Sequence, residues 1–348
     1  DNVNVDTLTL TSAATLDLYG DVEVAGTALD LSNLPDGASA VTLGANASIT
    51  TNDGNLTMTS EGVDGDFNLA MDTGAGTASL STIDVNSVTV DATGAVTLNG
   101  GVTADDRIDF GGAADVDLAA GSGAFDASTN NGDVLLNGGA VDGGQDVTVT
   151  AGTGTITLGD LGQNTALGSV DINGNPANVF LQGDISTDGG TGIQLEDDNL
   201  VLQNDVELTT TNDPVDVWDL AGNAHSLRIA AGTGAVTLDS IGGVDSLQVA
   251  GGQIDFDEAV TVNSDISAAA GNDSDINVVA GGGLTSTAGG AIALSAEGDV
   301  DVDADITGGM IALTANSDDA NGEDHDVELD ANIVGNSVTL DVAGDDAD

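Results

Sequence analysis

Residues Gly289 to Ala296 read GGAIALSA, and residues Gly308 to Ala315 read GGMIALTA, a near copy further along the chain. Each copy is a pair of glycines followed by a short segment in which apolar and small side chains alternate. Alternation with a period of two is typical of a β-strand with one buried face. The stretch therefore predicts a repeating unit that consists of a glycine-rich turn and a strand.

The same cassette, an apolar residue, a small or hydroxyl residue and then leucine, recurs along the chain. Most of the gaps between its leucines are close to multiples of about 18 to 20 residues, which predicts about 17 or 18 units. Stacked units of a short fixed period complete a common core with their neighbours. The sequence therefore predicts an all-β parallel β-solenoid (β-helix) with rungs of about 19–20 residues, continuous over residues 1–348. The leucines of the cassette are Leu43, Leu80, Leu98, Leu136, Leu158, Leu238, Leu294, Leu313 and Leu340.

The composition fits a narrow core. Aromatic residues make up only 2% of the chain, whereas glycine occurs 50 times, so the interior is expected to consist of valine, leucine, isoleucine and alanine. Hydrophobic residues make up 40%, which gives each rung enough apolar surface to fold despite the charge. The chain contains no cysteine, so it has no disulfide framework.

The charge balance is extreme, with 59 acidic residues against two arginines, Arg107 and Arg228, and a formal net charge of −57. A surface of this sign repels nucleic acid and anionic membranes, so neither is an expected partner. No apolar run has the length of a membrane span, so we expect no membrane insertion. The acid is expected to gather cations. Solubility of a repetitive sheet and a salty habitat are two further explanations that remain open.

Several rungs carry a resemblance to a known family: GAVTLNGGVTA (Gly94 to Ala104), GTITLGDLG (Gly154 to Gly162) and GGAIALSAEGDVDVDADI (Gly289 to Ile306). They resemble the repeats of bacterial filamentous-haemagglutinin-type exoproteins and related autotransporter passenger domains. The resemblance implies a long parallel β-helix displayed at the cell surface, as a segment of a fibre, a biofilm matrix filament or an adhesin stalk. The secretion domain of that family usually carries an Asn-Pro-Asn type motif near its N-terminus. Here the nearest match, Asn175-Pro176, lies in mid-chain.

The two ends of the sequence lead to an expectation about assembly. The chain begins with Asp1, and the strand pattern is present at Val3 to Thr11 and again at Ser337 to Val342. We expect a processed subunit or a segment of a longer chain. Solenoids usually cover their terminal rungs with a cap, and neither end shows one, so we expect copies of this chain to contact each other head-to-tail.

Two other functions are compatible with the same fold. The first is a ligand-binding adhesin that contacts a cell-surface glycan or protein through insertions at Gly121 to Asp133, Thr211 to Ser226 and Asn316 to Asp326. The second is a polysaccharide-active β-helix enzyme, which needs cations and aromatic side chains around its substrate. This chain has two arginines far apart in the sequence, no lysine and one tryptophan. We therefore expect no enzyme, no catalytic residue and no bound cofactor other than a metal.

Calcium is the predicted ligand. An acidic segment around Gly322 supplies hard oxygen ligands beside a residue that allows a sharp turn. The spacing differs from that of an EF-hand, and an acidic loop in solvent is the alternative. The predicted ligands are Asp318, Asp319, Asn321, Glu323, Asp324 and Asp326.

Overall fold

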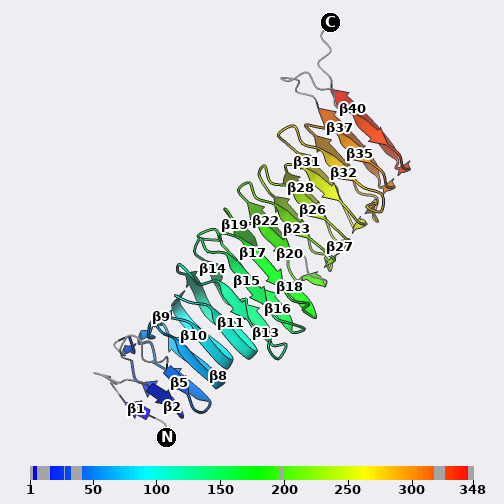
Figure 1. The fold of residues 1–348 in the computed structure, drawn as a ribbon. Coiled ribbons are helices and arrows are strands. Elements are labelled where there is room, and N and C mark those ends of the chain that lie inside the picture. The colour runs from blue at the N-terminus through cyan, green and yellow to red at the C-terminus, as the bar shows by residue number, and fades with distance from the viewer. Residues whose placement is uncertain are drawn as a thin grey trace. The chain divides into compact units, whose positions relative to one another are not determined.

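The computed structural model describes residues 3–5, 16–26, 28–32, 41–195, 199–316 and 326–343. Every regular element in these ranges is a strand, and the pairings between strands are parallel. The chain is a parallel β-solenoid of about 13 turns, which confirms the predicted fold class (Figure 1). Within the described ranges no helix could span a membrane.

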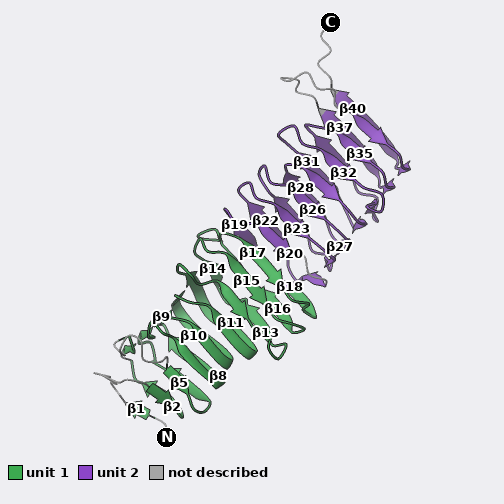
Figure 2. Cartoon of the chain, in the orientation of Figure 1, with its two compact units in different colours: residues 1–179 green, residues 180–348 purple. Residues whose placement is uncertain are grey.

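The chain divides into two compact units, residues 1–179 and residues 180–348 (Figure 2). The prediction of one continuous body over residues 1–348 stays a prediction. One strand, β18 (Asn178–Leu181), contains the point of division.

In residues 1–179, three faces of parallel strands surround the core, and the longest strands, β8, β10 and β11, bend from one face to the next. The first face contains β2 (Leu16–Leu18), β5 (Val41–Leu43), the starts of β8 (Val63–Gly74), β10 (Ile83–Leu98) and β11 (Val102–Leu118), then β12 (Ala124–Asp126), β15 (Val147–Thr150) and β17 (Val170–Asn173). The second contains β1 (Val3–Val5), β3 (Val22–Val24), β6 (Ala47–Thr50), the middles of the long strands, β13 (Asp133–Leu136) and β16 (Thr155–Leu158). The third contains β4 (Leu29–Asp30), β7 (Leu56–Thr57), β9 (Ala78–Leu80), the ends of β10 and β11, and β14 (Ala140–Asp142).

In residues 180–348 each turn contributes one short strand to each of three faces. The first face contains β20 (Ile193–Leu195), β23 (Val215–Val217), β26 (Val236–Leu238), β29 (Ile254–Phe256), β32 (Ile276–Val278), β35 (Val300–Val302) and β38 (Val327–Leu329). The second contains β21 (Leu200–Leu202), β24 (Leu220–Ala221), β27 (Ile241–Val244), β30 (Val260–Val262), β33 (Leu284–Ser286), β36 (Ile306–Thr307) and β39 (Ile333–Val334). The third contains β19 (Ile185–Thr187), β22 (Val206–Thr210), β25 (Leu227–Ala230), β28 (Leu247–Gly251), β31 (Ile266–Ala270), β34 (Ile292–Ala296), β37 (Met310–Asn316) and β40 (Ser337–Ala343).

The alternation that predicted the strands is the alternation between core and surface. Val236 and Leu238 are fully buried, and Thr237 between them is partly exposed. The near copies at 289–296 and 308–315 lie on adjacent turns, because Ile292 pairs with Ile311 and Leu294 with Leu313. The opening stretch therefore predicted its own pairing correctly.

The length of a turn varies more than the sequence predicted. The turn that joins Val236 to its partner Ile254 is slightly shorter than expected, whereas the turn that joins Ile306 to its partner Ile333 is considerably longer. The strands keep a constant register while the corners absorb the additional residues, so the chain makes fewer turns than expected.

The leucine cassette marks strands and not turns. Leu43 lies on the first face of its unit, Leu80 on the third and Leu136 on the second. All three faces need the same alternation to fill one core, so the cassette occurs on each of them. Its spacing is therefore a poor measure of the turn length.

Two of the three predicted insertions are parts of the coil, so that prediction was wrong. Residues 121–133 include strand β12, whose Phe125 is 1% exposed and packs edge-to-face on Phe110 with ring centroids 6.1 Å apart. Residues 211–226 include β23 and β24, which bury Val215 and Leu220. Their polar residues lie at the corners, which hid the short strands between them.

Candidate functional site

Most of the predicted calcium segment lies outside the described residues, namely Asp318, Asp319, Asn321, Glu323 and Asp324. Asp326 is described, and its backbone N–H donates to the Asp299 carboxylate at 2.7 Å. No group of three or more acidic or histidine residues in the described ranges is arranged to hold a metal ion. The calcium site stays a prediction.

Many acidic and asparagine side chains at the corners connect one turn to the next. Each accepts a hydrogen bond from a backbone N–H located about one turn later in the chain. Asp133 accepts from Thr155 at 2.8 Å, and Asp265 accepts from Ala291 at 2.7 Å. Asp142, which is 3% exposed, accepts from the backbone of both Asn164 and Thr165.

Part of the acidic composition is therefore structural, a role that sequence reasoning missed. A carboxylate is a strong acceptor for the N–H groups that a corner leaves unpaired. The available signal was the recurrence of aspartate and asparagine just before strands, for example Asp133 before Val134 and Asp205 before Val206.

Other carboxylates form rows on the outer surface of residues 180–348. Asp301 pairs with Glu328 on the next turn, between buried valines at 300 and 302. Burial raises the pKa of Asp301 above its ordinary value of 3.8, and the neighbouring carboxylates of Asp299 and Glu328 raise it further. Burial likewise raises the pKa of Asp239, with a contribution from Asp257. These rows are places where a cation would relieve repulsion.

The third face of residues 180–348 is different, because its outer side chains from β25 to β37 carry no carboxylate. These side chains are mostly small, and a shallow hollow of about 390 Å³ lies over Ala250, Ala269 and Ser295. In a chain of net charge −57, such a face is the surface best suited to contact another molecule. Its outward residues are Arg228, Ala230, Gln248, Ala250, Ser267, Ala269, Ala293, Ser295, Ala312 and Thr314.

Both arginines are held by carboxylates of their own unit. The Arg107 guanidinium donates to Asp109 Oδ2 at 2.7 Å. Arg228 forms an ion pair with Glu207, the residue beside it on the preceding turn. Arg228 also lines a polar groove of about 370 Å³ together with Asp205 and Ser246. Neither arginine therefore offers an uncompensated positive charge to an acidic sugar.

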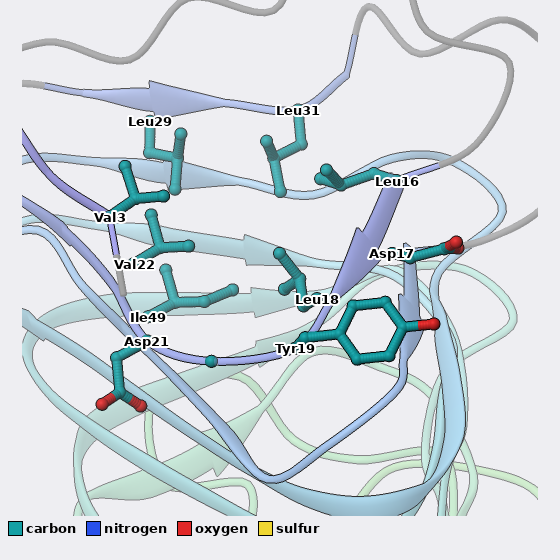
Figure 3. A pocket seen from close by; sticks show the side chains of 11 residues that line it. Val3, Leu16, Asp17, Leu18, Tyr19, Asp21, Val22, Leu29, Leu31 and Ile49 are labelled. Atoms are coloured by element: carbon teal, nitrogen blue, oxygen red, sulfur yellow. The ribbon is translucent and has the colours of Figure 1, made fainter. Parts of the chain in front are cut away.

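The apolar cavity in residues 1–179 belongs to the core. It has a volume of about 380 Å³, and Val3, Val22 and Ile49 line it in a row from three successive turns (Figure 3). Leu29 and Leu31 close another side, whereas Asp17 and Tyr19 lie at its rim (Figure 3). The lining presents no reactive group, so the cavity does not indicate catalysis.

The last described turn presents core-facing side chains to solvent. Val338, Leu340 and Val342 of β40 are 44%, 50% and 49% exposed. Their partners on the turn before, Ile311, Leu313 and Ala315, are at most 1% exposed. Since the two strands alternate in the same register, the row on β40 is core surface that no described residue covers.

Comparisons with models of protein families, with curated proteins and with solved structures find no match for this chain. Function is therefore inferred from the residues themselves.

Proposed function

We propose that this chain is a structural β-solenoid of the bacterial cell exterior, a subunit or segment of a surface fibre, matrix filament or adhesin stalk. The fold supports it, because stacked turns make a scaffold whose length grows with the number of repeats. The resemblance of its rungs to filamentous-haemagglutinin-type repeats supports the location at the cell surface. In this proposal the chain is not an enzyme.

The observation that carries the proposal is the exposed apolar row on β40. Strand edges and open cores favour pairing with another strand, and this row has the alternation of the strands already stacked below it. In this proposal a second copy of the chain covers it by adding a turn. A head-to-tail contact that does not close into a ring continues as a filament.

Electron microscopy and sedimentation of the full chain test the contact. Wild-type protein is expected to form filaments of uniform width, and Leu340→Asp is expected to leave folded short particles, because a carboxylate would be buried in the joint. Thr339→Asp is the matched control, since residue 339 is the outward neighbour on the same strand. Filaments of normal length from Leu340→Asp would show that this face is not the joint.

A ligand-binding adhesin is a second candidate, which the carboxylate-free third face favours. A neutral flat sheet is a surface on which a glycan or a protein can lie without charge repulsion. In this proposal Ala269→Asp abolishes attachment of the purified chain to cell surfaces while its filament length stays normal. Attachment that survives this substitution would contradict the second candidate.

A further inference from the structure

Asparagine followed by glycine is a reactive pair, because glycine has no side chain to hinder attack of its backbone nitrogen on the preceding carboxamide. The reaction releases ammonia and needs an accessible carboxamide and a backbone N–H that is not held elsewhere. Among the described residues the pairs are Asn99–Gly100, Asn131–Gly132, Asn137–Gly138 and Asn173–Gly174.

Two of these pairs are held by hydrogen bonds. Asn99 Nδ2 donates to Leu80 O at 3.1 Å, and Gly100 is buried. At the second pair, Asn131 Oδ1 accepts from a backbone N–H of the next turn at 3.0 Å, and Gly132 N donates to the Ala127 carbonyl at 2.8 Å. A nitrogen that already donates in this way is not free to attack.

The third pair is protected by burial. Asn137 is half-buried, and its Oδ1 has no contact with solvent. Gly138 is close-packed, because a Cβ built on it would lie 2.2 Å from the Ala113 carbonyl oxygen. Neither the ring-closed product nor the water needed to open it has room here.

The fourth pair differs in each respect. Asn173 and Gly174 are both exposed, at the corner that follows β17. The Gly174 N–H has no acceptor among the described residues, and Gly174 has a φ of 112°, a conformation open to glycine. The Asn173 carboxamide makes one bond, from Nδ2 to Asp171 Oδ2 at 2.9 Å, on the exposed surface.

We propose that Asn173–Gly174 is a site of spontaneous deamidation. The Gly174 backbone nitrogen loses its proton to water and attacks Asn173 Cγ. The new C–N bond closes a succinimide, and the Cγ–Nδ2 bond breaks to release ammonia. One water molecule then opens either carbonyl of the ring, which leaves aspartate or isoaspartate at position 173. No oxidant or enzyme takes part.

The two products affect the corner differently. Aspartate adds one negative charge beside Asp171. Isoaspartate lengthens the main chain at the end of β17, where Asn173 is in register with Thr150. The bond from Asn175 N to the Gly152 carbonyl, 3.1 Å long, follows directly and is expected to weaken. The site thus marks the age of a molecule that is not renewed.

Incubation of the full chain in mildly alkaline buffer made with heavy-oxygen water tests the proposal. Peptide mass spectrometry is expected to find one heavy oxygen at position 173 and isoaspartate accumulating there at least about tenfold faster than at Asn99 or Asn131. The rate is expected to rise with pH, because the attacking nitrogen must lose a proton. Asn173→Gln, whose side chain closes a ring far more slowly, is expected to remove the signal.

A urea-unfolded sample provides the second control. Unfolding removes the bonds that hold Asn99 and Asn131, so the four pairs are expected to react at similar rates there. Equal rates at Asn173 and Asn99 in the folded chain, or no isoaspartate at position 173, would overturn the proposal.

Discussion

Two threonines on adjacent turns differ in how their buried hydroxyl groups are bonded. Thr187 and Thr210 pair in register on β19 and β22, and they are 1% and 3% exposed. Thr210 Oγ1 donates to the Asp213 carbonyl oxygen at 2.5 Å. Thr187 Oγ1 has no partner among the described residues. A buried hydroxyl group is favourable only when it is bonded, so the two positions should respond oppositely to its removal.

Substitution by valine keeps the shape and removes the hydroxyl. Thr210→Val is expected to lower the free energy of unfolding by about 1–2 kcal/mol, because it leaves the polar groups of Asp213 unpaired. Thr187→Val is expected to be neutral or to raise it by up to about 1 kcal/mol. Urea unfolding followed by circular dichroism measures both. The same loss in both variants would contradict the difference in bonding.

The raised pKa of Asp239 has a consequence for stability against pH. A carboxyl group whose folded pKa lies above the ordinary 3.8 opposes folding once it is ionised. Its contribution is most favourable below 3.8 and is lost as pH rises through the folded pKa. Asp239→Asn is therefore expected to raise Tm at neutral pH and to have little effect in acid.

Asp30 is the control of opposite sign. Hydrogen bonds from the side chain and backbone of Ser32 lower its pKa, so its stabilisation is present above the ordinary value and disappears as pH falls. Asp30→Asn should therefore not raise Tm at neutral pH. A rise in Tm for both variants would point to net charge alone and not to the surroundings of Asp239.

At the scale of the strand, a corner bond decides how one turn joins the next. Asp117 and Asp142 are register partners on the third face of residues 1–179. Asp142 is buried and binds the backbone of the next turn, whereas Asp117 is exposed. Asp142→Ala is expected to cost about 2 kcal/mol, since bonds to a charged group contribute about 1.5–3 kcal/mol. Asp117→Ala is expected to change stability by less than about 0.5 kcal/mol. Denaturant midpoints of the two variants decide the matter.

The glycine pair of the repeat also has a role at this scale. A Cβ on Gly309 would lie 1.9 Å from the Gly289 carbonyl oxygen of the turn below, so only glycine allows the two turns to approach this closely. Gly309→Ala is therefore expected to lower Tm or prevent folding. Gly242, around which nothing lies within 4 Å, is the tolerant control. Equal Tm values for the two alanine variants would contradict the close approach.

For the whole molecule, the net charge of −57 opposes the compact state through self-repulsion. The reach of this repulsion falls from about 30 Å at 0.01 M salt to about 10 Å at 0.1 M. Tm is expected to rise with sodium chloride over that range. A Tm independent of salt would mean that the corner bonds and rows already compensate the charge.

Calcium is expected to act beyond screening if the predicted segment binds it. At matched ionic strength calcium should raise Tm more than magnesium, because a flexible set of carboxylates suits the larger ion. The variant with both Asp318→Asn and Asp324→Asn should lose this difference while it keeps the response to sodium. Equal responses of the wild type to calcium and magnesium would leave screening alone.

The sequence by itself determined the strands, their parallel stacking and the direction of most side chains, because one alternating pattern has one way to bury its apolar face. It also identified the turn-to-turn pairing of residues 289–296 with 308–315. The tertiary structure decided which strand belongs to which face, since all three faces use the same pattern and the corners vary in length. It decided as well that Asp142 is buried in a corner while Asp117 lies in solvent. The two aspartates follow the same kind of strand, and only the backbone of the next turn distinguishes them.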